Sequence, residues 1–265
     1  MTFTLKLVFS GLVTFVPIMD PQNPLTARVM VNRIWQHHFT RPIVETPSNF
    51  GQMGARPSNP ELLDYLAARF VENKWSIKAM HREIMLSSTY MLSSDNIEAN
   101  STVDADNRFV WRANWRRLDA ESLRDSLLYV SGNLDLTMGG PAVRFDDSNN
   151  RRAVYGFVSR WKPNATMTLF DFPLPIQTAE QRNVTNVPVQ RLFLMNSSFV
   201  ELQANSFPRR LTGDQTQKVR QAYRILYGRA PDPQELDRDL SFVAKHDWAE
   251  YARVLLNSNE FQWVN

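Results

Sequence analysis

Apolar side chains recur at helical spacing through most of the chain, and polar, turn-rich stretches separate these runs. The first run covers residues 24–39, where Asn23 followed by Pro24 is typical of a helix start and Arg41-Pro42 favours its end. One face of this helix collects Ala27, Met30, Val31, Ile34, Trp35 and His38, whereas Arg28, Asn32, Arg33 and Gln36 fall largely elsewhere. The pattern predicts an amphipathic helix that buries its apolar face.

Two further helices are predicted before residue 94. Asn59 and Ser76 stand in the cap position in front of two more apolar patterns of helical spacing. Residues 42–60, between the first two helices, hold four prolines and two glycines, which predicts an irregular loop. We therefore expect three helices within residues 23–94.

The second half of the chain is also helical in pattern, apart from its middle. Helix starts are predicted after Asp119, at Asn186-Val-Pro188, at Ser198, near Thr216, at Asp232-Pro233 and after Asp247. Residues 133–186 are the least regular part, although a short strand is predicted at residues 153–158. A long loop of this kind is either a functional, lid-like segment or an ordered arm packed across the helices.

These patterns predict a mainly α fold, in which residues 23–265 form a single irregular multi-helix domain with a small β or irregular element. Residues 1–22 are a separate N-terminal segment. Its apolar run at residues 7–19 has the length of a signal-peptide core and is too short to span a bilayer. The alternation at residues 3–7 favours a buried strand instead. We expect an N-terminal strand or a signal-like segment, and no membrane span.

Composition narrows the possible partners. The formal net charge is +3 and the pI is about 9.3, and the arginine doublets are scattered at residues 116–117, 151–152 and 209–210. A nucleic-acid-binding arm carries a continuous basic run, so we predict no nucleic-acid partner. The absence of cysteine excludes disulfides, thiolate metal sites, a catalytic cysteine and thioether haem attachment.

Three of the four histidines lie within residues 23–94. His37 and His38 point about 100° apart on a helix, which does not favour a shared metal ion. We interpret His38 and His81 as histidines at the edge of the core with backbone hydrogen-bond partners. A site that combines His37, His81 and Glu45 remains open as the alternative, but we predict neither a metal site nor a cofactor.

Three carboxylates are concentrated near the start of a later helix, at Asp119, Glu121 and Asp125. Such a group suits acid–base chemistry or cation binding. We interpret Asp119 as the helix cap and Glu121 as a partner of the helix dipole that forms an ion pair with Arg124. The glycine-rich turn at residues 138–141 lacks the lysine and hydroxyl residue of a phosphate-binding loop.

The strongest candidate for ligand binding is the run Arg160, Trp161 and Lys162, with Arg182 nearby in sequence. An aromatic ring between two cations suits stacking on a sugar ring or contact with an anionic polymer. The competing interpretation is a buried Trp161 whose flanking cations extend into solvent. We predict that these four residues bind a ligand, and we assign no catalytic residue.

Several long motifs in the chain resemble a known family. They are, in order, NPLTARVMVNRIWQHHF (23–39), WSIKAMHREIMLSSTY (75–90), RRLDAESLRDSLL (116–128), TMGGP (137–141), YGFVSRWKPN (155–164), EQRNVTNVPVQRLFLMNS (180–197) and LLNSNEF (255–261). Together they resemble the planctomycete-specific domain one family, a domain of unknown function, over roughly Asn23 to Asn265. Ser198 departs from the family pattern, in which a proline is expected.

The resemblance implies a setting for the chain. In that family the domain usually follows a cytochrome c-type domain in large exported proteins. It therefore implies a periplasmic or otherwise extracytoplasmic location, with cytochrome c-type domain proteins or polysaccharide as partners. Residues 1–22 do not look like the upstream domains, so we expect a stand-alone or truncated form.

Two functions follow from these observations. The favoured one is a non-catalytic helical accessory or ligand-binding module of an exported protein system. The alternative is a hydrolytic or metal-assisted enzyme that acts on complex carbohydrate. Its site would combine His37, His81, Glu45, Asp119 and Arg160.

Overall fold

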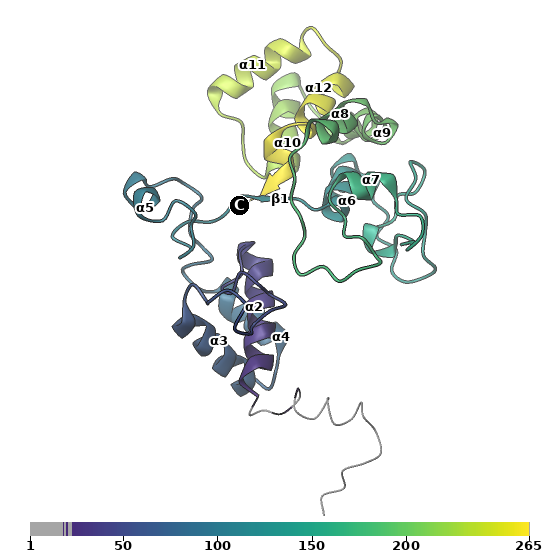
Figure 1. Cartoon of the computed structure of the whole chain (residues 1–265). Helices are drawn as coiled ribbons and strands as arrows, with labels where there is room; N and C mark the ends of the chain where they lie inside the picture. The colour runs from purple at the N-terminus through teal and green to yellow at the C-terminus, as the bar shows by residue number, and fades with distance from the viewer. Residues whose placement is uncertain (1–17, 19, 21–22, 265) are drawn as a thin grey trace, which may run out of the picture. The chain divides into compact units, whose positions relative to one another are not determined.

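The structure, a computed structural model, describes Ile18, Asp20 and residues 23–264 (Figure 1). The predicted N-terminal strand or signal-like segment lies almost wholly outside the described residues. The chain divides into two compact units, of which unit 1 ends at Trp115 and unit 2 spans Arg116–Val264. The expectation of one domain over residues 23–265 stays a prediction.

Unit 1 is built around three helices that pack together (Figure 1). Its described helices are α2 (Pro24–Phe39), α3 (Pro60–Glu72), α4 (Ile77–Met85) and the short α5 (Glu98–Val103). The side chains of Asn23, Asn59 and Ser76 accept hydrogen bonds from amides in the first turns of α2, α3 and α4, which confirms the three predicted helix starts. The buried core of the unit includes Val31, Ile34, Trp35, Leu63, Leu66, Phe70, Met80 and Ile84.

One polar side chain of α2 lies inside this core. Asn32 is fully buried, although the sequence pattern places it away from the apolar face. Its side-chain oxygen accepts from the amide of Val44 at 2.8 Å, and its Nδ2 donates to the carbonyl of Val44 at 3.1 Å. The side-chain amide of Asn32 thus makes the two hydrogen bonds with Val44 that the backbone of a neighbouring strand would make. These bonds hold the loop after α2 against the helix.

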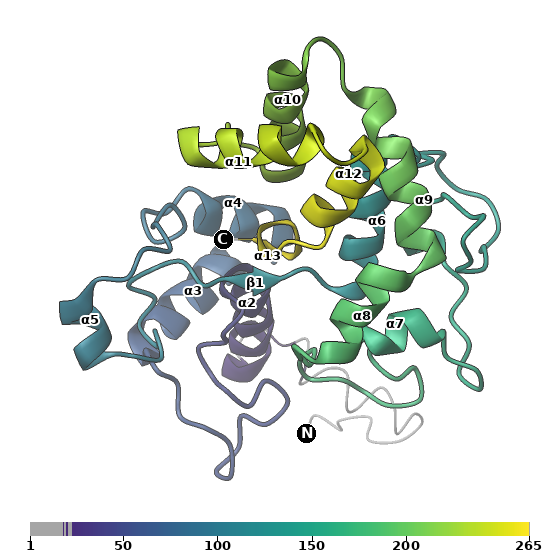
Figure 2. The same cartoon turned by 90° about the horizontal axis from the view of Figure 1, so that it is seen from above.

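Unit 2 contains the remaining helices. They are α6 (Ala120–Ser131), α7 (Ala165–Leu169), α8 (Pro188–Asn196), α9 (Ser198–Ser206), α10 (Gln215–Tyr227), α11 (Pro233–Val243), α12 (Trp248–Leu256) and α13 (Asn259–Gln262), with 3₁₀ turns η1 (Ala153–Tyr155) and η2 (Phe207–Arg210). Helix α9 packs against both α6 and α12 (Figure 2). The aspartates Asp119, Asp232 and Asp247 cap α6, α11 and α12 as predicted.

The strand content of the described chain is small. Strand β1 (Arg116–Arg117) pairs antiparallel with β2 (Trp263–Val264), with Arg116 opposite Val264 and Arg117 opposite Trp263. This two-stranded pair is the sheet of the described residues, which confirms the mainly α fold class. No helix in the described part of the chain combines the length and the apolar character needed to cross a membrane.

Arginine side chains organise the irregular middle of unit 2. The buried Arg124 of α6 donates to the carbonyl of Arg151 at 2.9 Å and to that of Asn149. Arg151 in turn donates to the carbonyls of Pro141, at 3.2 Å, and Thr137, at 3.1 Å. These backbone oxygens therefore accept hydrogen bonds from guanidinium groups, as they would from a neighbouring strand in a sheet. The segment of residues 137–151 is thus an ordered arm held by side-chain hydrogen bonds.

The strand predicted at residues 153–158 is wrong. Asp125 accepts a hydrogen bond from the amide of Ala153 at 2.7 Å, and the amide of Gly156 donates back to the carbonyl of Ala153 at 2.9 Å. These bonds curl the chain into η1, and only an isolated bridge between Val143 and Gly156 remains of strand pairing. The conformation of residues 153–158 therefore depends on Asp125 of α6, a distant contact that the alternation of apolar and polar residues cannot predict.

Candidate functional site

Trp161 lies in the loop between η1 and α7 and is 97% exposed. The amide of Lys162 donates to the hydroxyl oxygen of Ser159 at 3.0 Å, which closes a tight turn around Arg160 and Trp161. Arg160 and Lys162 are exposed as well. The interpretation of Trp161 as a buried residue with snorkelling neighbours is therefore wrong.

Other large apolar side chains close to Trp161 in the sequence are exposed as well. Four large apolar side chains within residues 154–161 are exposed, namely Val154, Phe157, Val158 and Trp161. Single exposed apolar residues are common, but four within eight consecutive positions, one of them an almost fully exposed indole, indicate a contact surface. Downstream, Asn164 caps α7 through the amide of Met167, at 3.0 Å, and donates to the carbonyl of Phe145, at 3.3 Å. These hydrogen bonds of Asn164 hold the C-terminal end of the Trp161 loop in place.

Arg182 has a different environment from the Trp161 loop. Its guanidinium makes two bonds of 2.7 Å to the two carboxylate oxygens of Glu121 and lies over the ring of Phe172. The hydrogen bond that Arg182 donates to Glu121 is the main reason that the pKa of Arg182 is raised. Glu121 therefore pairs with Arg182, and the predicted ion pair of Glu121 with Arg124 is wrong because Arg124 turns to backbone carbonyls. The ligand-binding role assigned to Arg182 stays a prediction.

A cavity of about 340 Å³ lies between α6, α7, α8 and the arginine-bound segment. Its lining includes Phe145, Phe199 and the guanidinium of Arg124, which lies over both rings. Ser198, where the resemblance leads us to expect a proline, begins α9 here and donates its hydroxyl to Asp147. A proline at this position would lack that bond, so the serine ties α9 to the segment that precedes η1.

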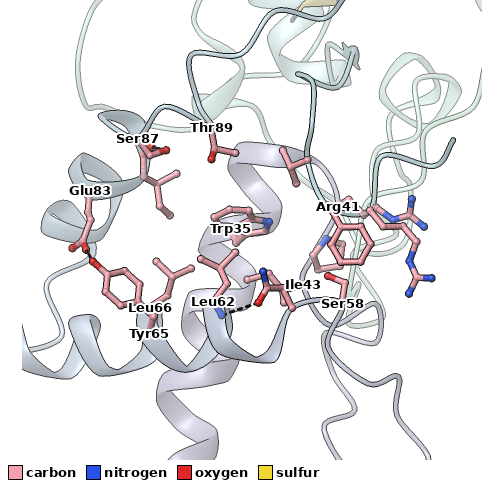
Figure 3. Close-up of a pocket in the computed structure, with 16 residues that line it drawn as sticks. Trp35, Arg41, Ile43, Ser58, Leu62, Tyr65, Leu66, Glu83, Ser87 and Thr89 are labelled. Atoms are coloured by element: carbon pink, nitrogen blue, oxygen red, sulfur yellow. Dashed lines mark hydrogen bonds between the residues drawn. The ribbon is translucent and has the colours of Figure 1, made fainter. Parts of the chain in front are cut away.

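A larger cavity, of about 490 Å³, lies within unit 1 (Figure 3). Trp35 of α2 lies at its centre, and Leu62 and Leu66 of α3 line one side (Figure 3). The apolar lining also includes Ile84 of α4, Ile43 of the loop held by Asn32, and Pro42, Phe109 and Val110. The apolar patterns place Trp35, Leu62, Leu66 and Ile84 on the buried faces of their helices but do not identify Ile43, and they give no sign of a cavity between these residues.

The two ends of this cavity carry opposite charges. At one end, Glu83 accepts hydrogen bonds from the hydroxyl of Tyr65, at 2.9 Å, and from Arg69, at 3.1 Å. The bond to Glu83 raises the pKa of the Tyr65 hydroxyl above its ordinary value. At the other end lie Arg41 and Arg108. Figure 3 shows Glu83 and Arg41 on opposite sides of Trp35.

The histidines of unit 1 form a pair. Nε2 of His38 lies 2.7 Å from Nδ1 of His81, and the two rings meet edge to face. Both are half-buried, as expected at the edge of a core. The backbone partner predicted for His81 is wrong, because its ring is paired with the imidazole of His38. The described residues contain no group of three or more His, Cys, Asp or Glu side chains arranged to hold a metal ion.

The residues of the alternative enzyme hypothesis are distributed over the two units. His37, His81 and Glu45 belong to unit 1, whereas Asp119 and Arg160 belong to unit 2. Glu45 pairs with Arg41 at 2.8 Å and Asp119 caps α6. The joint site of these five residues stays a prediction.

A family model matches the chain over residues 16–243, which is most of its length. The chain belongs to the PSD1 family, described as a protein of unknown function (DUF1553). This match confirms the resemblance to a domain family of unknown function up to residue 243, and the planctomycete association stays a prediction. The PSD1 region includes both the Trp161 loop and the unit 1 cavity. No curated protein and no solved structure matches the chain significantly.

Proposed function

We propose that the chain is a non-catalytic ligand-binding module and that its Trp161 loop binds acidic polysaccharide. The observation that carries the proposal is the 97% exposure of Trp161 between two exposed cations, Arg160 and Lys162. An indole ring offers a flat apolar face to the C–H face of a sugar ring, and the two cations offer partners to carboxylate or sulfate groups of the same polymer.

The expected gain from stacking is large enough to measure. An aromatic side chain offers roughly 200 Å² of contact area, and a sugar ring that covers about a third of it removes roughly 70 Å² from water. At about 25 cal/mol per Å², this burial stabilises the complex by about 2 kcal/mol. The exposed cations add a contribution that salt screens.

The surroundings of the loop support binding because they limit its freedom before a ligand arrives. The bonds of Arg124 and Arg151 hold the preceding segment, and Asn164 fixes the following one. A preorganised loop loses less conformational entropy on binding than a mobile one. The extracytoplasmic location and the cytochrome c-type partners implied by the family resemblance remain predictions that this proposal does not need.

The test is binding of the full chain to sodium alginate, an acidic polysaccharide, with neutral dextran as the reference polymer. We expect retardation in alginate gels and little in dextran gels, with Trp161→Ala weakening alginate binding tenfold or more. Trp115→Ala is the matched control, because Trp115 is the other strongly exposed tryptophan of the described residues, at 53%. Replacement of both Arg160 and Lys162 by glutamine should weaken binding and reduce its dependence on salt.

Two outcomes would overturn the proposal. One is equal alginate binding by Trp161→Ala and Trp115→Ala. The other is the release of reducing ends from the polymer at a rate that depends on the protein, which would favour the alternative of a carbohydrate-degrading enzyme.

A further inference from the structure

The cavity of unit 1 has the features of a second ligand site. We propose that it binds a small aromatic carboxylate that carries a hydroxyl group, with the ring against the accessible edge of Trp35, the carboxylate at Arg108 and the hydroxyl at Glu83. This inference goes beyond the polysaccharide binding proposed for unit 2 and does not depend on it.

The size and lining of the cavity set the class of ligand. Its volume of about 490 Å³ falls within the range of roughly 300 to 1,000 Å³ that is typical of small-molecule sites. Trp35, Ile43, Leu62 and Leu66 supply apolar and aromatic lining for the body of the ligand. A flat ring suits such a lining, because it can pack on the exposed ring of Phe109 and the accessible edge of Trp35 without the entropy cost of a flexible chain.

The cationic end of the cavity suits a carboxylate. Arg41 already pairs with Glu45 and donates to the carbonyl of Asp106 at 2.6 Å. Arg108 is exposed, and among the described residues no acceptor is hydrogen-bonded to its guanidinium. The N-terminus of α3, with its cap Asn59, also lines this end and adds a partial positive charge. A carboxylate would therefore find a planar, two-point partner in Arg108.

The backbone holds Arg108 in place. The carboxylate of Asp104 accepts from the amides of Arg108 and Phe109, both at 2.9 Å. Burial opposes ionisation of Asp104, but these bonds outweigh it and hold the pKa of the carboxyl below its ordinary value. Val110 adopts a φ of 53°, which is rare for a β-branched residue, so the surrounding contacts must impose this turn.

The acidic end of the cavity suits a hydroxyl donor. The bonds from Tyr65 and Arg69 both fall on Oε1 of Glu83. Oε2 of this carboxylate is therefore open to a hydrogen bond from the ligand. A hydroxyl that donates to an ionised carboxylate makes a charge-assisted bond, which is stronger than a neutral one. A second carboxylate in this place would be repelled, so the two ends of the site fix the orientation of the ligand.

The test is titration of the full chain with 4-hydroxyphenylpropionate and with 3-phenylpropionate, which lacks the hydroxyl, by isothermal calorimetry. We expect the hydroxylated probe to bind at least fivefold more tightly. Arg108→Gln should weaken both probes about tenfold, whereas Arg33→Gln, a change on the exposed face of α2 outside the cavity lining, should leave the affinities within twofold. Glu83→Gln should reduce the preference for the hydroxylated probe.

An NMR measurement locates the probe. The indole N–H signal of Trp35 should shift during the titration, because Trp35 lines the cavity. Absence of binding by the wild-type chain, or equal affinities for Arg108→Gln and Arg33→Gln, would overturn the proposal. Trp161→Ala, in unit 2, should bind these probes like the wild type, so a failure of the polysaccharide proposal is distinguishable from a failure of this one.

Discussion

Replacement of Asn32 by leucine removes the polar link between α2 and the loop that lines the unit 1 cavity. Leucine has the branched shape of asparagine and a larger volume, so the change leaves no empty space but deprives Val44 of both of its side-chain partners. Val44 is 2% exposed, so its amide and carbonyl have little access to water as a substitute. The main effect is therefore two unpaired backbone groups inside the core.

The magnitude follows from the cost of these groups. Each buried polar group without a partner costs about 1 to 3 kcal/mol. The added apolar contact of leucine and a small shift of the loop recover part of this cost, which leaves a net destabilisation of about 2 to 4 kcal/mol. That is a large share of the stability of an ordinary domain, which is about 5 to 15 kcal/mol.

Hydrogen exchange read by mass spectrometry measures this effect within unit 1. Peptides that cover residues 24–72 should exchange faster in Asn32→Leu, by a factor that corresponds to the lost free energy of opening. Gln36→Leu is the matched control, since it changes an amide one turn further along α2 that is only half-buried, and it should stay within about 0.5 kcal/mol of the wild type. Equal exchange in Asn32→Leu and the wild type would refute the role given to Asn32.

Two further predictions concern the charged and buried polar groups of unit 2. The pKa of Glu235 is lowered from its ordinary value of 4.5 to about 2, mainly by the hydrogen bond that Arg229 donates to it. The pair therefore stabilises the fold fully above pH 4.5, and this stabilisation is lost as the pH falls towards 2. Urea unfolding at pH 7 and pH 3 should therefore show a larger loss for the wild type than for Glu235→Gln, by about 1 kcal/mol because the Arg229 side chain is 40% exposed. Tyr251→Phe removes a 2.8 Å hydrogen bond to the buried Asp239 and should lower the free energy of unfolding by about 1 to 3 kcal/mol. A change below about 0.5 kcal/mol would contradict this prediction and show that the remaining hydrogen bonds of Asp239 compensate.

The helical parts of the fold were predictable because their signals are local. Asn23, Asn59, Ser76 and Asp119 each stand directly before the helix they cap, and the apolar spacing that follows needs no knowledge of distant residues. These features recover the helix starts and the mainly α class.

The features that sequence patterns missed depend on long-range contacts. The buried Asn32 is paired with Val44, the segment predicted as a strand is bent by Asp125, and Glu121 is paired with Arg182, 61 positions away. The unit 1 cavity is lined by residues from three helices and three loops, so no spacing rule could identify it. Trp161 was identifiable as a candidate from its cationic neighbours, but its exposure was not.

The central claim is that Trp161 contacts the ligand directly. The most direct measurement is an NMR titration of the full chain with alginate oligosaccharides, in which the indole N–H signal of Trp161 is assigned by its loss in Trp161→Phe. The account predicts that this signal shifts more than those of the other tryptophans, and that Arg160→Gln reduces the shift at a given oligosaccharide concentration. An unchanged Trp161 signal at saturating oligosaccharide would contradict the account.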